Sequence, residues 1–238
     1  MNFAGILAGG IGSRMESSVP KQFLKIGDTP IVVRTLNTFL KEECVDKVIL
    51  AMNPQWEDYC RNMLSEYGVD MSRVEIIHGG TTRFLSMVNI VKKSMEILGD
   101  NLTEDDMMLI HDCARPFVSS RIIGDNFVIA KEYDMVTTSV PTIDTVLIAE
   151  DGKQSTVVPN RDTVFLDQGP QTFKIKEFYD LFEKLTQAEI DAYMEAGRMY
   201  LEHDLSVGIV KGERTNFKIT TEFDMLLGNM MIQDGQIK

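Results

Sequence analysis

The chain has 238 residues and a formal net charge of -12 at pH 7, with 36 acidic and 24 basic residues. This acidic balance argues against nonspecific affinity for nucleic acid or for an anionic membrane, because both require a positive surface field. With 44% hydrophobic residues and 7 prolines, the composition also excludes a disordered chain and predicts a globular fold with a sizeable core.

The cysteines and the apolar segments indicate a cytoplasmic protein. Cys44, Cys60 and Cys113 are odd in number, widely spaced and without a CxxC motif, which favours reduced thiols over a disulfide framework or a zinc site. The first ten residues lack the basic flank of a signal peptide, and no apolar run approaches the roughly 20 residues that span a bilayer. We therefore expect a cytosolic location and no membrane partner.

Apolar runs of strand length alternate along the chain with segments of helical spacing. Strands are predicted at 3–8, 47–52, 74–78, 107–112, 135–140 and 206–212. Helices are predicted between them at 30–40, 54–68, 83–98 and 120–133. This alternation predicts an α/β fold with a mostly parallel sheet covered by helices on both faces, and such sheets bind ligands beyond the carboxyl ends of their strands.

Two later regions depart from this alternation. Residues 143–164 resemble a hairpin of two strands around the turn "EDGKQ", and they are too polar for a core position, so we expect a protruding β-arm. The C-terminal third is predicted to be helical at 176–185, 187–203 and 222–233. Without a convincing linker, the whole chain (1–238) is interpreted as one domain with an arm at about 143–164.

The first predicted strand runs into a glycine-rich segment, "LAGGIGSRMESSVPKQF" (7–23). Met15 stands where the dinucleotide fingerprint needs its third glycine, and the GK[ST] of a Walker loop is absent. The glycines and the cations Arg14 and Lys21 suit a polyphosphate, since glycine exposes backbone N–H groups. An ordinary tight turn with solvated cations is the alternative, and the segment alone leaves both open.

Five motifs together resemble the polyol-phosphate cytidylyltransferases, the group of the 2-C-methyl-D-erythritol 4-phosphate and ribitol-5-phosphate enzymes. They are, in order, LAGGxGxRM-x4-PKQF, "GGTTRFLSMVN" (79–89), "HDCARPFVSSRII" (111–123), "DQGPQTF" (167–173) and "NFKITTEFDM" (216–225). The resemblance covers nearly the whole chain and implies a Rossmann-like nucleotidyltransferase fold. Three further stretches, 102–112, 115–123 and 185–199, look more like the ribitol enzyme, so ribitol 5-phosphate is the acceptor we expect.

The reaction that the resemblance implies is attack by the acceptor's phosphate oxygen on the α-phosphorus of CTP, with release of pyrophosphate. A phosphate monoester is already an anion near neutral pH, because its second pKa is about 6, so no activated nucleophile is needed. His78, His111 and His203 accordingly show neither metal-ligand spacing nor a Ser/His/Asp arrangement. The chemistry instead requires cations and a divalent metal, Mg²⁺, at the phosphates.

The resemblance also assigns the nucleotide site. It makes Arg14 and Lys21 catalytic, and it places Asp112 at Mg²⁺ or the ribose, with Arg115 beside it. Without the resemblance, the 79–89 motif is an ordinary helix start capped by Thr81 or Thr82, and Asp112 and Arg115 form an internal pair. The remaining nucleotide-binding positions are Leu7, Ala8, Gly9, Gly10, Gly12, Gly80, Arg83 and Ser86.

For the acceptor, the resemblance implies that Arg161 and Lys218 hold its phosphate and take part in catalysis, and that Thr145 contacts it. The family's arm crosses to a neighbour, which implies a homodimer with Arg161 in the partner's site. Without the resemblance, Arg161 is simply a surface arginine.

Two departures from the family pattern leave the acceptor open. Met194-Glu195-Ala196 replaces a tripeptide such as Thr-Asp-Ala, and Gly169 replaces the threonine before Pro170. The 2-C-methyl-D-erythritol 4-phosphate enzyme of isoprenoid synthesis is therefore the alternative acceptor assignment. A catalytically silent nucleotide-binding domain is the alternative from another class.

Overall fold

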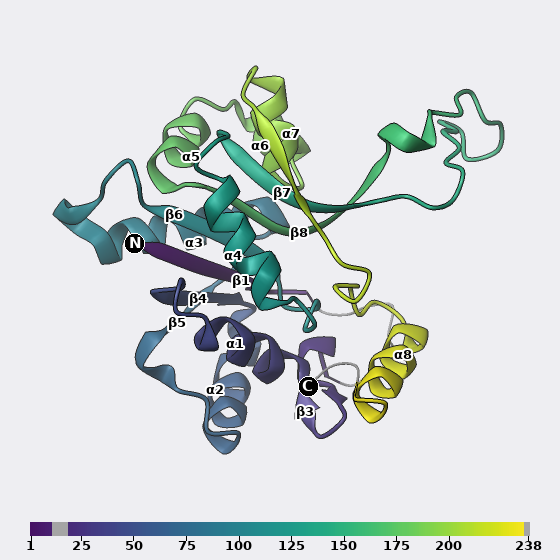
Figure 1. The fold of residues 1–238 in the computed structure, drawn as a ribbon. Coiled ribbons are helices and arrows are strands. Elements are labelled where there is room, and N and C mark those ends of the chain that lie inside the picture. Colours follow the sequence, from purple (N-terminus) through teal and green to yellow (C-terminus); the bar gives the residue numbers. More distant parts are fainter. Residues whose placement is uncertain (11–18, 236–238) are drawn as a thin grey trace.

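The computed structural model describes residues 1–10 and 19–235 and is built around a seven-stranded sheet (Figure 1). All neighbouring strands in it are parallel except that β8 runs antiparallel to both β6 and β7. The fold class predicted from the sequence is confirmed. In the order β5-β4-β1-β6-β8-β7-β9, the strands are Val74–His78, Lys47–Met52, Asn2–Ala8, Met107–Asp112, Phe165–Lys174, Met135–Pro141 and Val207–Lys211.

Helices cover both faces of this sheet. Alternate side chains of each strand point to opposite faces, and each face packs against helices in its own apolar cluster. In β1, Ala4 and Ile6 belong to one cluster and Phe3 belongs to the other. The first cluster takes side chains from α1 and α4, and the second takes them from α3, α5 and α7. The helices are α1 (Ile31–Lys41), α2 (Glu57–Glu66), α3 (Arg83–Leu98), α4 (Ser120–Ile129), α5 (Ile175–Phe182), α6 (Gln187–Ala192), α7 (Ala196–Glu202) and α8 (Glu222–Gln233).

Smaller elements complete the part of the chain that the structure describes. A two-stranded sheet pairs β2 (Lys25–Ile26) with β3 (Thr29–Pro30), and a 3-10 helix, η1 (Lys21–Phe23), precedes it. Cys60 and Cys113 are buried thiols, as expected, and burial raises the pKa of Cys60 to about 12. None of the helices in the described ranges is long and apolar enough to cross a membrane.

The helix predicted at 187–203 is wrong as a single element. The chain is extended between α6 and α7, with ψ angles of 131° at Tyr193 and 162° at Glu195. This break buries the Tyr193 ring against Phe84, at a centroid distance of 5.7 Å, and leaves the tyrosine 1% exposed. Burying a large aromatic side chain stabilises the fold by more than the few helical hydrogen bonds that are lost.

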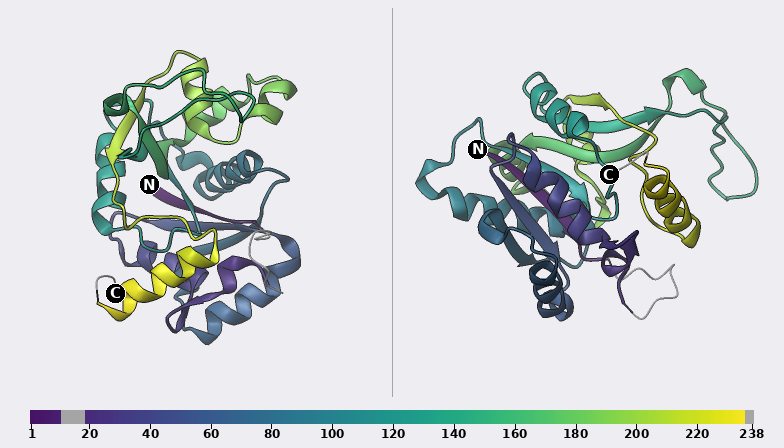
Figure 2. Two further views of the ribbon diagram at one scale, coloured as in Figure 1. Left: turned by 90° about the vertical axis from the view of Figure 1, so that its right-hand side faces the viewer. Right: turned by 60° about the horizontal axis from the view of Figure 1, so that its bottom comes forward.

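The arm projects from the body, as predicted, between the end of β7 and the start of β8 (Figures 1 and 2). The two strands predicted within 143–164 do not form. A single antiparallel bridge joins Ile148 to Val157, and a 3-10 helix, η5 (Arg161–Thr163), lies near the arm's return. Ile143, Leu147 and Val158 are more than half exposed, so within one chain the arm has no apolar surface to pack against.

Candidate active site

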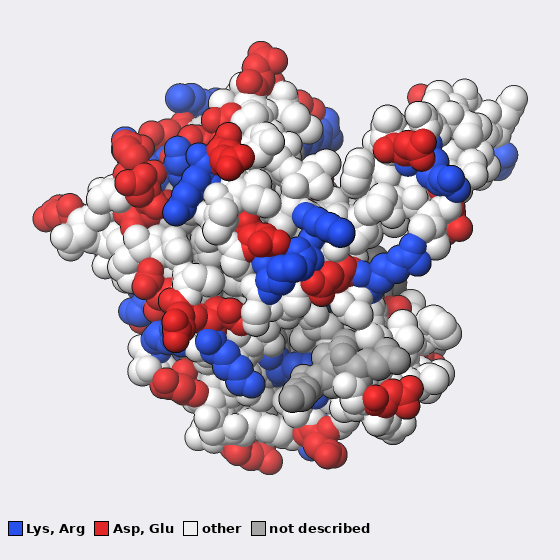
Figure 3. All heavy atoms as spheres, in the orientation of Figure 1, with Lys and Arg blue, Asp and Glu red and all other residues white. Residues whose placement is uncertain are grey.

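A cavity of about 380 Å³ lies beyond the carboxyl ends of the parallel strands. Its walls come from the ends of β1 and β6, the loop before α3, η1 and the segment before α8, which are the places where four of the five sequence motifs lie. Figure 3 shows basic and acidic side chains interspersed over one face of the body. The cations that line the cavity are the individual side chains of Lys21, Arg83 and Lys218. The lining residues are Leu7, Ala8, Gly9, Gly10, Lys21, Gln22, Gly80, Thr81, Thr82, Arg83, Ser86, Asp112, Cys113, Ala114 and Lys218.

The glycine-rich segment reaches this cavity through η1. Lys21 Nζ donates a hydrogen bond of 2.9 Å to the Ile219 carbonyl, and buried Gln22 donates one of 2.7 Å to the Ala8 carbonyl. These bonds place the Lys21 side chain beside the segment that carries Lys218, although the two lysines are far apart in sequence. Gly12, Arg14 and Met15 lie outside the described residues, and so does the predicted Arg14–Lys21 pairing.

The loop before α3 is held by its own polar groups. Gly80 N–H donates to Ser86 Oγ at 3.0 Å, and Ser86 Oγ donates to the Thr82 carbonyl at 2.8 Å. Thr82 also caps α3, because its hydroxyl accepts from the Leu85 N–H at 3.1 Å. The helix cap expected from the residues alone is therefore present at Thr82, and the capped loop lines the cavity as well.

Gly80→Ala tests whether this loop needs its close backbone approach. A Cβ at Gly80 would lie 2.5 Å from Leu85 Cβ and 2.9 Å from Ser86 N, and backbone atoms cannot yield as a flexible side chain does. We expect the variant to raise the KM for CTP, the nucleotide that the resemblance implies, at least tenfold. At Gly79 the nearest atom would be Ser86 Oγ at 3.1 Å, so Gly79→Ala is the matched control and should change KM much less. Equal KM values in the two variants would contradict this role of Gly80.

Asp112, the last residue of β6, is the centre of charge in the cavity. Its Oδ1 lies 3.2 Å from Arg83 Nε and its Oδ2 lies 2.7 Å from Lys218 Nζ. Burial by itself raises the pKa of the Asp112 carboxyl, but the charges of Arg83 and Lys218 overcome this and hold that pKa well below its usual range. Asp112 is therefore ionised at all physiological pH values.

The alternative interpretation of an internal Asp112–Arg115 pair is not supported, because the described residues show no ion pair between these two side chains. Arg115 Nη1 donates instead to the Asn216 carbonyl at 2.8 Å, which ties the loop after β6 to the segment before α8. Arg115 thus lies behind the cavity wall rather than in the lining.

Comparison with known proteins assigns the family. The model of the family described as "IspD: 2-C-methyl-D-erythritol 4-phosphate cytidylyltransferase" matches residues 3–234. The chain belongs to this IspD family. It is accordingly a CTP-dependent cytidylyltransferase, which is a nucleotidyltransferase.

Solved structures of similar proteins agree with this assignment. The 4-diphosphocytidyl-2C-methyl-D-erythritol synthase of Anaerococcus prevotii is 29% identical with a TM-score of 0.80, and the match covers 98% of this chain and 96% of that one. The 2-C-methyl-D-erythritol 4-phosphate cytidylyltransferase of Francisella tularensis is 24% identical with a TM-score of 0.78, covering 96% and 98%. That of Thermus thermophilus, at 23% identity and a TM-score of 0.75, covers 98% and 100%.

A divalent metal fits this IspD-family site only as a companion of the nucleotide. Within 1–10 and 19–235, no group of three His, Cys, Asp or Glu side chains is placed to hold a metal ion. Asp112 is a single carboxylate, and Mg²⁺ is commonly bound through one or two carboxylates together with substrate phosphates and water. Asp112 could therefore supply one ligand if Arg83 or Lys218 shifts toward the phosphates.

Two of the predicted acceptor residues lie away from the cavity. Arg161 and Thr145 are exposed on the arm, where Arg161 Nη1 donates to the Ile143 carbonyl at 3.3 Å, and neither residue lines the cavity of its own chain. Of the predicted acceptor residues, the structure thus brings Lys218 alone into the cavity.

Sequence reasoning missed the role of the segment between α6 and α7. Arg83 Nη1 donates to the Met194 carbonyl at 3.2 Å, so this segment meets the same guanidinium that pairs with Asp112. The signal in the sequence was the departure of Met194-Glu195-Ala196 from the family pattern, but a local departure does not reveal which distant side chain the segment contacts.

Proposed function

We propose that this protein is a 2-C-methyl-D-erythritol 4-phosphate cytidylyltransferase, in which a phosphate oxygen of the acceptor attacks the α-phosphorus of CTP. The family match and the acceptor named for the similar structures support this acceptor over ribitol 5-phosphate. The observation that carries the proposal is the cavity itself. There Lys21, Arg83 and Lys218, from three distant parts of the chain, surround exposed glycine backbone.

Each side chain has a task in this reaction. Lys21, with Arg14 of the same sequence motif, stabilises the negative charge that develops on the α-phosphoryl group. Gly9 and Gly10 leave their N–H groups open to the phosphates, and the loop from Gly80 to Ser86 holds the cytosine. Lys218 orients the acceptor phosphate, whose oxygen needs no base because it is already ionised.

Mg²⁺ bound to the triphosphate would neutralise part of its charge and orient it, with Asp112 as the protein ligand. Because the site offers one carboxylate, we expect the metal to bind with CTP and not before it. Mg²⁺ alone should change the melting temperature by less than about 1 °C, whereas saturating CTP with Mg²⁺ should raise it by about 5 °C or more. Excess EDTA should reverse most of the CTP-dependent shift. Equal stabilisation by Mg²⁺ alone would contradict a metal carried by the nucleotide.

We also propose that the whole chain is one domain and that two copies form a homodimer through the arm. The exposed apolar side chains of the arm and the position of Arg161 outside its own cavity support this. In the dimer, Arg161 of one subunit would hold the acceptor phosphate in the site of the other.

Mixing of inactive subunits tests the shared site. Arg161→Ala and Lys21→Ala homodimers should each be nearly inactive. Verified mixed dimers should regain up to about half of the wild-type activity per dimer, because one of the two sites then contains both side chains. Absence of any recovery in such dimers would show that each chain completes its own site.

Ribitol 5-phosphate is the second candidate acceptor, because the stretches 102–112, 115–123 and 185–199 resemble the ribitol enzyme. Gly169 and Met194 also lack the hydroxyl groups of the family pattern, which leaves the acceptor open. The deciding experiment follows pyrophosphate release from CTP and Mg²⁺ with each of the two acceptors at equal concentration. A higher kcat/KM for 2-C-methyl-D-erythritol 4-phosphate supports the main proposal, and the reverse order replaces it. CTP binding without release from any polyol phosphate would indicate a silent nucleotide-binding domain.

A further inference from the structure

A second acidic centre lies next to the cavity, beyond Arg83. Asp167 near the start of β8 and Glu195 before α7 both accept hydrogen bonds from Gln171 Nε2, at 3.3 Å and 3.4 Å. Asp167 also accepts from the Thr137 hydroxyl of β7. Three elements that are distant in sequence thus bring these two carboxyl groups together.

The neighbouring Asp167 makes ionisation of Glu195 less favourable. Burial, followed by the charge of Asp167 and a hydrogen bond to it, raises the pKa of Glu195, while the Arg83 charge lowers it. Two neighbouring carboxylates repel each other, so Glu195 binds a proton more readily than an isolated glutamate does. When protonated, Glu195 offers a hydrogen-bond donor, and both carboxyl groups offer acceptor lone pairs.

The side-chain amide of Gln171, which contacts both carboxyl groups, has one atom without a hydrogen-bond partner among the described residues. Gln171 is 2% exposed, and its Nε2 donates hydrogen bonds to both carboxyl groups. Its Oε1 has no hydrogen-bond partner among the described residues. Buried amide oxygens are normally paired, so an unpaired one on the side chain that contacts both carboxyl groups points to a hydroxyl or amine donor supplied by a ligand.

Arg83 connects this pair to the nucleotide cavity. Its guanidinium donates to the Met194 carbonyl, one residue before Glu195, and its Nε pairs with Asp112, which also binds Lys218. Arg83 and Asp112 thus link the pair to Lys218, which we assign to the acceptor phosphate. A second phosphate would be repelled there, whereas neutral hydroxyl groups would not.

We infer that Asp167 and Glu195 determine acceptor specificity by hydrogen bonding to the hydroxyl groups of the polyol chain. Each polyol hydroxyl can donate a hydrogen bond to a carboxylate and accept one from a protonated carboxyl group. Neighbouring hydroxyls can therefore bind to Asp167 and Glu195 together, whereas an apolar chain cannot and a second phosphate is repelled. This inference rests on the proposed function and adds to it the part of the acceptor that is recognised.

The test separates hydroxyl recognition from phosphate recognition. Asp167→Asn and Glu195→Gln keep the size of each side chain and remove its charge. For the better of the two polyol phosphates, each variant should raise the acceptor KM about tenfold, the factor expected for a hydrogen bond to a charged group, with the CTP KM unchanged. n-Pentyl phosphate, which has the phosphate and five carbons but no hydroxyls, should inhibit the wild type and both variants with equal constants.

Glu177→Gln provides the matched control. Glu177 in α5 is also a partly buried glutamate whose pKa is raised mainly by burial, but its charged neighbours, Asp134, Lys174 and Glu104, lie at the other end of β8. It should leave both KM values unchanged. Asp167 is exposed, so Asp167→Asn should melt close to the wild type and stays informative even if Glu195→Gln does not fold.

Three results would count against the inference. An unchanged acceptor KM in Asp167→Asn overturns it while leaving the cytidylyltransferase reaction in place. A parallel loss of n-pentyl phosphate inhibition shows that the pair only supports the structure around the phosphate site. Absence of wild-type turnover with both polyol phosphates overturns the proposed function, and this inference with it.

Discussion

Replacing Lys21 with methionine is expected to lower kcat by two to three orders of magnitude, because a charge aimed at the developing transition state is lost. Removal of one such contact typically costs about 2.7 to 4 kcal/mol of activation free energy. The substitution keeps an unbranched side chain that is one atom shorter, and it loses the hydrogen bond to the Ile219 carbonyl, which costs about 1 kcal/mol of stability. The variant should therefore fold and still bind CTP.

Lys25→Met is the matched control for this variant. Lys25 lies four residues further on in β2, where its ammonium lies over the Tyr67 ring at 5.6 Å and outside the cavity lining. We expect normal turnover from it in the same pyrophosphate assay. Near-normal turnover in Lys21→Met, with the melting temperature preserved, would remove Lys21 from the catalytic residues.

Asp112→Asn is expected to have the second large effect, a loss of turnover of about a hundredfold or more. The amide preserves the shape of the side chain but removes the charge that holds Arg83 and Lys218 in position and that would bind the metal. Since the Asp112 pKa lies far below neutral, the loss should be the same at every pH from 6 to 9. A variant that recovers at one end of this range would contradict a permanently ionised Asp112.

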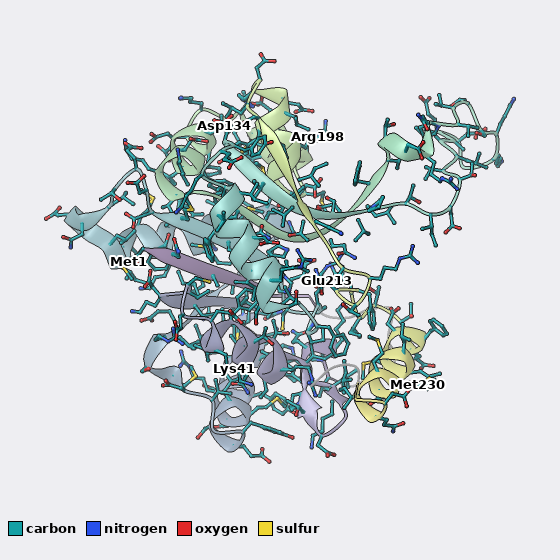
Figure 4. The ribbon with its side chains drawn as sticks, viewed as in Figure 1. Met1, Lys41, Asp134, Arg198, Glu213 and Met230 are labelled. Atoms are coloured by element: carbon teal, nitrogen blue, oxygen red, sulfur yellow. The ribbon has the colours of Figure 1, made fainter. Side chains whose placement is uncertain are left out.

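Asp134→Asn is the control that shows the effect of removing an ionised aspartate outside the cavity. Hydrogen bonds from Ser206 hold the Asp134 pKa below its ordinary value, and this residue precedes β7 at the end of the sheet opposite to the cavity (Figure 4). We expect it to lower the melting temperature without changing kcat. A comparable loss of turnover in both variants would indicate that the Asp112 effect is structural.

Much of the fold could be predicted because its central strands are continuous apolar runs. Parallel strands buried on both faces, such as 47–52 and 107–112, have a strong local signal. Strand β8 could not be predicted, because "FLDQGPQTFK" carries a Gly-Pro pair and polar residues that locally indicate a turn. Its pairing with β7 shifts register between Thr137 and Ser139, which lets Pro170, with no N–H to donate, sit inside the sheet.

The candidate site was predictable residue by residue but not in its pairings. The motifs identify Lys21, Arg83, Asp112 and Lys218. All four lie near strand ends or helix starts, and these meet at the carboxyl ends of the parallel strands. Which cation pairs with Asp112 depends on long-range packing, and sequence proximity wrongly favoured Arg115. The pairing of Asp167 with Glu195 was missed for the same reason, because it depends on the strand β8 and on the break before α7.

The most direct test of the central claim is a crystal structure of the protein with Mg²⁺ and a non-hydrolysable CTP analogue. The account predicts the cytosine against the loop of Gly80 and Ser86, and the triphosphate between the Gly9–Gly10 backbone and the Lys21 ammonium. A nucleotide bound elsewhere, or a triphosphate that Lys21 and Lys218 do not approach, would contradict it.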